Sequence, residues 1–264
     1  MMNKLPLLLL LLTCFSLKAQ LPSECQLDIG VNLGGLADFG TELPFVDLMK
    51  NAREWYTKDI NNPNAAFNSD QATNLSYRAD GYPTHVPQTI PESVFDQKVV
   101  TIWGITAGWP NGEYTLLWDG DGELSLFGAF SNLTTTGPGR MTFDFAHFPD
   151  AIIELTIERS AVNDPIRNIR LLMPGSEATY LDQPFNPIFI DKMQDFKTVR
   201  FMDWGQTNNW GQKRDEGWDN PALFSWSERP KMDHYTWAYE KGIPYEMMVK
   251  LLNDHDLDGW LCVP

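Results

Sequence analysis

Residues 198–212 read TVRFMDWGQTNNWGQ, and this stretch indicates the fold class more clearly than any other. Its first five residues have the composition of a buried strand. An acid, an indole, a glycine and paired amides follow directly. Such a cluster is either a polar turn or a rim that faces a ligand, because α/β proteins bind ligands beyond the carboxyl ends of their parallel strands. The flanking sequence helps to decide between the two.

Strand-like and helix-like segments alternate on both sides of this stretch. Residues 27–33 have the character of a strand, and residues 44–56 carry apolar side chains at helical spacing. Repeated βα units build either a doubly wound sheet or a (β/α)8 barrel. The later segments are predicted as a strand or link at 166–173, helices at 186–196, 234–240 and 244–253, and strands at 198–202 and 260–263.

The middle of the chain has a different pattern. Short β-type runs are separated by Gly and Asn turns, which is typical of an antiparallel β-sandwich or jelly roll. The segment DGDGE at 119–123 predicts a hairpin, since Asp-Gly between alternating strands is a strong turn signal. A calcium loop is the alternative for its carboxylates. The strands are predicted at 99–103, 113–118, 123–130, 141–145 and 152–157.

Composition excludes several classes of partner. The 264 residues carry a formal net charge of -15, so a phosphate backbone or an anionic membrane would be repelled. The segment Gly30–Gly35 lacks the spacing of a dinucleotide fingerprint, and the four His have no zinc-site spacing. We therefore expect no cofactor and no metal. Cys25 and Cys262 could form one disulfide.

The N-terminus has the features of a secretory signal peptide. Lys4 precedes an apolar run that is shorter than the roughly 20 residues of a membrane span, and Ala19 suits a cleavage site. In the alternative, a lipoprotein, Cys14 would be lipidated, but Thr13 is bulky for that motif. The mature protein is therefore expected to be secreted, periplasmic or on the cell surface, with no membrane span.

Several motifs resemble one family in collinear order over nearly the whole mature chain. They are NLGGLAD at 32–38, IRNIR at 166–170, FNP at 185–187, VRFMDW at 199–204 with Thr207-Asn208, and WSERP at 226–230. The hairpin-like segment 114–127 also matches. The family comprises secreted bacterial proteins described as cellulose-binding or glycoside-hydrolase-like, of the (β/α)8 glycosidase clan with an inserted β-sandwich.

This resemblance implies an α/β protein with an all-β insert: an incomplete (β/α)8 (TIM) barrel, with a sandwich or jelly roll after the first βα unit. The clan's catalytic acid/base Glu and nucleophile Glu would lie beyond Pro264, so the chain resembles the N-terminal part of a longer enzyme and is expected to be inactive alone. The expected organisation is a signal peptide at 1–19, a first βα unit at 20–58, a linker at 59–92, the sandwich at 93–160 and further βα units at 161–264.

The candidate site residues lie at strand ends and in the loop after residue 203. The resemblance gives Arg200 the clan's role of holding a nucleophile ionised, and the alternative is a structural salt bridge. Asp203 and Trp204 suit hydroxyl binding and ring stacking, or else a cap and a packed indole. The predicted saccharide-binding residues are Asn32, Arg200, Asp203, Trp204, Asn208 and Trp226.

Three functional hypotheses follow. The first is a secreted carbohydrate-active protein whose barrel portion binds a polysaccharide or oligosaccharide. The second is a non-catalytic glycan-binding protein that uses aromatic residues of the sandwich, namely Trp103, Trp109 and Trp118. The third is a structural surface module without a ligand.

Overall fold

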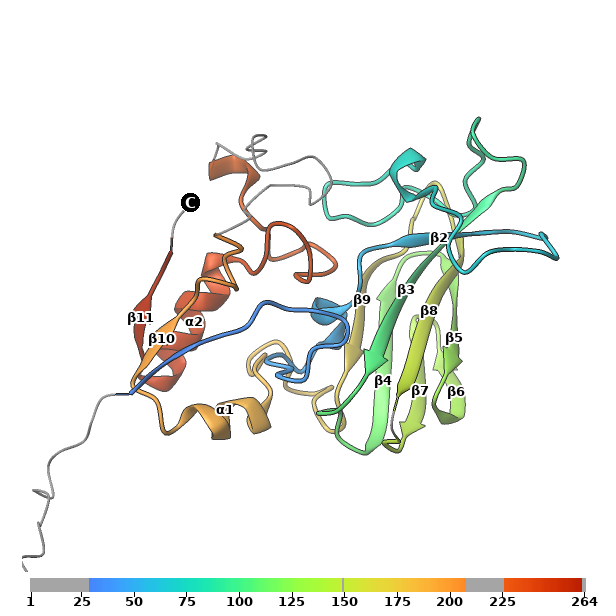
Figure 1. Cartoon of the computed structure of the whole chain (residues 1–264). Coiled ribbons are helices and arrows are strands. Elements are labelled where there is room, and N and C mark those ends of the chain that lie inside the picture. The colour runs from blue at the N-terminus through green and yellow to red at the C-terminus, as the bar shows by residue number, and fades with distance from the viewer. Residues whose placement is uncertain (1–28, 149, 208–225, 263–264) are drawn as a thin grey trace, which may run out of the picture.

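A β-sandwich and a smaller α/β unit make up the molecule in the computed structural model (Figure 1). The structure describes residues 29–148, 150–207 and 226–262. The sandwich consists of two four-stranded antiparallel sheets, with strand orders β2-β3-β8-β5 and β6-β7-β4-β9. Its strands are β2 (Tyr56–Asp59), β3 (Gln97–Ile105), β4 (Gly112–Asp119), β5 (Gly122–Gly128), β6 (Ser131–Gly137), β7 (Arg140–Phe145), β8 (Ala151–Ser160) and β9 (Arg167–Leu172).

Alternation along the strands builds the sandwich core. In β8, Ile153, Leu155 and Ile157 are fully buried between the sheets, whereas Glu154 faces the other side and bonds the Tyr56 hydroxyl at 2.7 Å. This period of two confirms the sandwich that the sequence predicts. The sheets nevertheless include β2 and β9, which lie outside the predicted 93–160 range.

The α/β unit contains a three-stranded parallel sheet of order β1-β10-β11. Its elements are β1 (Gly30–Asn32), α1 (Pro187–Met193), β10 (Thr198–Arg200), α2 (Tyr245–His255) and β11 (Asp258–Trp260). Helix α1 begins as predicted, with Pro187 in its first turn and the Asn186 side chain accepting from the Ile188 N–H at 3.0 Å. A second hydrophobic core lies between this sheet and the helices.

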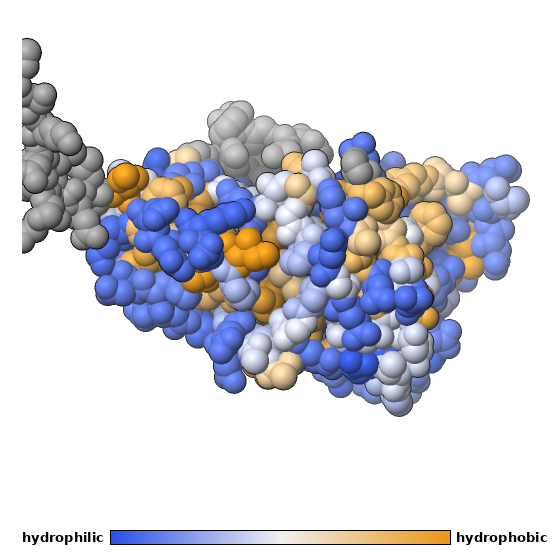
Figure 2. All heavy atoms as spheres, turned by 90° about the horizontal axis from the view of Figure 1, so that it is seen from below, coloured by the Kyte–Doolittle hydropathy of each residue, from blue (hydrophilic) through white to orange (hydrophobic). Residues whose placement is uncertain are grey.

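The α/β and all-β parts are therefore both present, but the parallel strands form an open sheet and no closed barrel among the described residues. None of the described helices is long and apolar enough to span a membrane. On the face shown in Figure 2, hydrophilic residues are spread over both parts, with smaller hydrophobic patches between them. The predicted signal peptide and Cys25 lie outside the described residues.

The helix predicted at 44–56 is wrong. The segment contains only the short 3-10 helix η1 (Leu48–Asn51), which Asp47 caps, and it then becomes extended and enters β2. Phe45 packs in the core of the α/β unit, while Leu48 and Met49 pack in the core of the sandwich. The apolar residues recur because the chain crosses between two cores, not because one helical face is buried.

The hairpin predicted at 119–123 is also wrong. Strand β4 pairs with β7 and β9, whereas β5 pairs with β8, so the segment connects the two sheets. Gly120 has a φ of +92°, and Asp-Gly supplies this conformation to either type of connection. Asp119 accepts from Asn168 and Asp121 from Arg159, each at 2.7 Å. No group of three or more metal-ligating acids, His or Cys occurs among the described residues.

Smaller differences concern the C-terminal third. Residues 234–240 form turns instead of the predicted helix, and the last strand begins at Asp258, two residues before the predicted start. The 3-10 helices η2 (Ala72–Asn74) and η3 (Trp226–Glu228) complete the described elements. The predicted strand at 198–202 and helix at 244–253 are confirmed as β10 and α2.

Candidate functional site

The three parallel strands end in one row of side chains. In the strand register Asn32 lies beside Arg200, and Arg200 lies beside Trp260. These residues end β1, β10 and β11, so they share the carboxyl edge of the sheet. This edge is where open α/β sheets bind their ligands.

Asp203 joins this row from the turn after β10. The Asn32 side-chain amide donates to Asp203 Oδ2 at 2.7 Å, although the two residues are 171 positions apart. The turn is held by main-chain bonds from Gly205 to Phe201 and from Gln206 to Asp203. Two of the predicted site residues are therefore in direct contact, and each is at least partly accessible to solvent.

Arg200 occupies the middle of the row. Its guanidinium carbon lies 4.9 Å from the centre of the Trp260 ring, and its Nη2 lies 3.2 Å from the Met202 sulfur. The buried Nε–H has no hydrogen-bond partner among the described residues, and no ion pair of Arg200 occurs there either. A buried guanidinium N–H without an acceptor is unusual, so the structural salt bridge weighed above is absent from this part of the chain.

Trp260 is a site residue that the sequence did not indicate. Its side chain is 60% exposed, which leaves one indole surface open beside Arg200. The residue lies in a segment predicted only as a strand, and no local motif marks it. Only the pairing of β11 with β10 brings it to the row.

The predicted stacking role of Trp204 is contradicted. Its side chain has no exposed surface and packs against Phe45, Phe189 and Phe201, with ring centres 5.4–6.4 Å apart. The turn after β10 folds the indole back under the sheet into the second core. Trp204 is therefore the packed indole of the alternative interpretation.

Trp226 lies on the surface near the start of α2. It is 65% exposed and stacks on Tyr245 with ring centres 5.7 Å apart. Arg229 covers the ring at 4.5 Å and pairs with Glu246 at 2.8 Å. Burial and the nearby Cys262 both raise the pKa of Tyr245, which places this aromatic pair close to the segment that follows β11. Asn208 lies outside the described residues.

The indoles that favoured binding by the sandwich lie in its core. The exposed fractions of Trp103, Trp109 and Trp118 are 0%, 5% and 8%. Their rings pack on neighbours inside the sandwich, for example Trp109 on Tyr114 at 5.3 Å. They therefore offer no aromatic surface to a glycan.

Comparisons of the chain with protein-family models, with curated proteins and with solved structures find no match.

Proposed function

We propose that this protein is a secreted carbohydrate-active protein that binds a polysaccharide or oligosaccharide at the carboxyl edge of its parallel sheet. The observation that carries the proposal is the row formed by Asn32, Arg200 and Trp260, together with Asp203. Sugar rings present hydroxyls at their edges and apolar C–H groups on their faces. The row offers an amide and a carboxylate for the hydroxyls and an exposed indole for a ring face.

The Nε–H of Arg200, which has no acceptor within residues 29–148, 150–207 and 226–262, supports the same site. A hydroxyl or carboxylate oxygen near the row would satisfy this donor, for which the described part of the chain supplies no acceptor. The open edges of the sheet support the further proposal that it is the front part of a (β/α)8 barrel of the glycosidase clan. Every residue of β11 is exposed, so a further strand could pair there.

Binding to a panel of soluble polysaccharides by affinity electrophoresis tests the proposal. Trp260→Ala and Asp203→Ala are each expected to weaken binding about tenfold, because one removes the stacking surface and the other a charged acceptor. Phe127→Ala is the matched control, since Phe127 is an exposed aromatic residue on the sandwich. The proposal is wrong if the control weakens binding and the two site variants do not.

We propose that residues 20–264 bind glycan without hydrolysing it. Retaining hydrolysis needs two carboxyl groups about 5–5.5 Å apart, one as acid and one as nucleophile. At the described strand ends the Asp203 carboxylate accepts a hydrogen bond from the Asn32 amide. The resemblance gives Asp203 a role in binding and not in proton transfer. Release of reducing sugar by the purified chain would contradict this proposal, and loss of that release in Asp203→Ala would also contradict the binding role of Asp203.

A further inference from the structure

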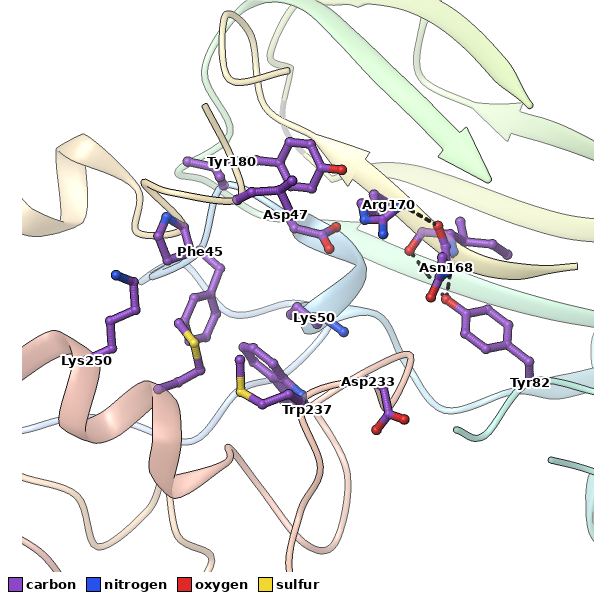
Figure 3. Close-up of a pocket in the computed structure, with 16 residues that line it drawn as sticks. Phe45, Asp47, Lys50, Tyr82, Asn168, Arg170, Tyr180, Asp233, Trp237 and Lys250 are labelled. Carbon is purple, nitrogen blue, oxygen red and sulfur yellow. Dashed lines mark hydrogen bonds between the residues drawn. The ribbon is translucent and has the colours of Figure 1, made fainter. Parts of the chain in front are cut away.

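A cavity of about 420 Å³ lies between the sandwich and the α/β unit, away from the strand-end row (Figure 3). Strand β9, the segment around η1, the loop before α1, the turns at 232–237 and helix α2 all contribute to its wall. None of the row residues lines it. Its lining residues are Phe45, Val46, Asp47, Lys50, Tyr82, Asn168, Ile169, Arg170, Tyr180, Leu181, Pro184, Met232, Asp233, Trp237, Met247 and Lys250.

The charges around this cavity are balanced. Asp47 and Asp233 contribute two carboxylates, and Lys50 and Arg170 contribute two cations. Lys250 also lines the cavity but is paired with Asp254 at 2.8 Å. The described lining of the cavity therefore has no excess of either charge, although the whole chain carries -15.

Two of these charged groups, Asp47 and Lys50, are held in position by hydrogen bonds to the main chain. Asp47 Oδ1 accepts from the main-chain N–H groups of Met49 at 3.0 Å and Leu171 at 3.1 Å. The Lys50 amine donates to the His234 carbonyl at 2.6 Å and lies 4.8 Å above the Trp237 ring. A site held in place in this way loses little conformational freedom when a ligand binds.

Arg170 is held in a similar manner. Its guanidinium lies 5.4 Å from the centre of the Tyr180 ring, and Nη1 donates to the Asn168 carbonyl at 3.2 Å. Figure 3 shows the Tyr180 hydroxyl turned towards Arg170, with the Asp47 carboxylate between Tyr180 and Lys50. Acid, cation and phenol thus converge on one side of the cavity.

These groups keep hydrogen-bonding capacity. Among the described residues nothing bonds Asp47 Oδ2, and the Lys50 amine has one acceptor for its three N–H groups. Burial raises the pKa of Asp47 and lowers that of Lys50, while their opposite charges partly offset both effects. A ligand that bonds here replaces few water contacts, so each bond strengthens binding more than it would on an open surface.

We infer that this cavity is a second saccharide site, which takes one neutral sugar residue or a short neutral oligosaccharide. A carboxylate accepts from sugar hydroxyls, and the amine and guanidinium donate to them. The apolar side chains of Phe45, Leu181 and Met247 suit the C–H faces of a ring. Because the fixed charges cancel, a charged ligand would leave one charge unmatched. The inference shares the ligand class of the proposed function but uses different residues.

The charge of the sugar provides the test. Glucose, galactose, mannose and xylose, and the uronate and protonated 2-amino form of each hexose, are titrated into the full chain by saturation-transfer NMR. At least one neutral sugar is expected to bind more tightly than its charged forms. The inference is wrong if none of the sugars binds, or if a uronate or an amino sugar is preferred.

Two variants change the charge of the cavity in opposite directions. Asp47→Asn keeps Oδ1 for Met49 and Leu171 and leaves one positive charge in excess, so preference moves about tenfold towards the uronate. Arg170→Gln leaves one negative charge in excess, and preference moves about tenfold towards the amino sugar. A purely structural role for these residues would not move the two preferences in opposite directions. Circular dichroism verifies that both variants fold.

The matched controls separate this site from the strand-end row. Arg159→Gln changes an exposed arginine on β8 that pairs with Asp121, and it is expected to leave sugar binding unchanged. Asp203→Ala is expected to weaken polysaccharide binding, and the opposite preference shifts of Asp47→Asn and Arg170→Gln are expected to persist when they are combined with it. If Asp203→Ala abolishes all small-sugar binding while Asp47→Asn and Arg170→Gln have no effect, this inference fails and the proposed function stands. If Asp203→Ala leaves polysaccharide binding unchanged while Asp47→Asn and Arg170→Gln move the small-sugar preferences in opposite directions, the proposed function alone is contradicted.

Discussion

At the level of single residues, Trp204 and Trp260 show how tertiary position decides what a side chain can do. Both follow or end a strand of the parallel sheet, and both are flanked by apolar and acidic neighbours in the sequence. One indole is fully buried and the other is 60% exposed. Residue type and spacing predicted a stacking indole near the strand ends, but they could not show which tryptophan turns outwards.

The two tryptophans give a direct comparison. Trp204→Ala is expected to lower the free energy of unfolding by about 3–5 kcal/mol, because it leaves a cavity in the second core. Trp260→Ala is expected to change it by less than about 0.5 kcal/mol, because the side chain is mostly exposed. Urea denaturation measures both. Similar losses in the two variants would contradict the burial described above.

His234 predicts a pH dependence of stability. Burial, and to a smaller extent Lys50 and Lys241, lower the pKa of its imidazole from 6.5 to about 4 in spite of its bond to the Thr236 carbonyl. A lowered pKa means that the neutral ring is favoured by folding. The stability is therefore complete above pH 6.5 and is lost as the pH falls towards 4, by about 3 kcal/mol in total.

The measurement is the free energy of unfolding at several pH values between 4 and 7. His234→Gln is expected to remove this part of the slope. His147→Gln serves as the control, since His147 is exposed. If the pH dependence persists in His234→Gln and disappears in His147→Gln, it comes from His147 and the prediction is wrong.

At the level of elements, alternation and capping signals succeed where one face of a segment is buried. Five sandwich strands and both α-helices follow from such signals, including the Asn186-Pro187 start of α1. Strand β6 gave no signal, because it is an edge strand with six of its seven residues exposed. The helix predicted at 44–56 failed for the opposite reason, since apolar residues there serve two cores.

The turn glycines give an element-level prediction. Gly139, between β6 and β7, has a φ of +69°, and a Cβ there would overlap the Trp118 carbonyl oxygen. Gly175 has a similar φ of +75°, but a Cβ there would meet open space. Gly175→Ala is therefore expected to lower the free energy of unfolding by about 1–2 kcal/mol, because the only cost is that of placing alanine in the left-handed backbone conformation.

Gly139→Ala has the same conformational cost and, in addition, a steric overlap between the new Cβ and the Trp118 carbonyl oxygen. We expect it to lower the free energy of unfolding by at least about 2 kcal/mol more than Gly175→Ala does. Guanidinium denaturation of the two variants measures the difference. Equal losses would show that the β6–β7 turn can move away from Trp118.

At the level of the whole molecule, the sequence predicted a β-rich middle flanked by α/β segments, but not the path between them. The pairing of β2 and β9 with the sandwich depends on contacts far apart in the chain, which local patterns do not contain. The sequence placed Asn32 and Asp203 in one site but did not predict the hydrogen bond between them. The charged cavity was not foreseen, because its residues are scattered between positions 45 and 250.

Hydrogen exchange is expected to differ between the two parts. Strands β3 and β8 are paired on both sides and bury their inner residues, so their amides should exchange slowly. Strands β1 and β11 are edges of a small sheet and are largely exposed, so their amides should exchange faster. Mass spectrometry of peptic peptides measures this. Equal protection of β11 and β8 would contradict the open edge and, with it, the proposal that further strands pair there.

The crossing between the two parts has a practical consequence. Phe45 bridges to Phe185 and Asp47 to Leu172, both antiparallel, so the outgoing and returning chains run as a narrow two-stranded neck. Main-chain bonds from Val46 to Pro184 and from Asn186 to Pro44 close it. A module attached through such a neck has its two ends next to each other, which suits transplantation. A graft of the residues between the neck positions into a surface turn of another scaffold would also need a substitute for Tyr235, which lies outside them but packs in the sandwich core and stacks on Trp55 at 4.5 Å.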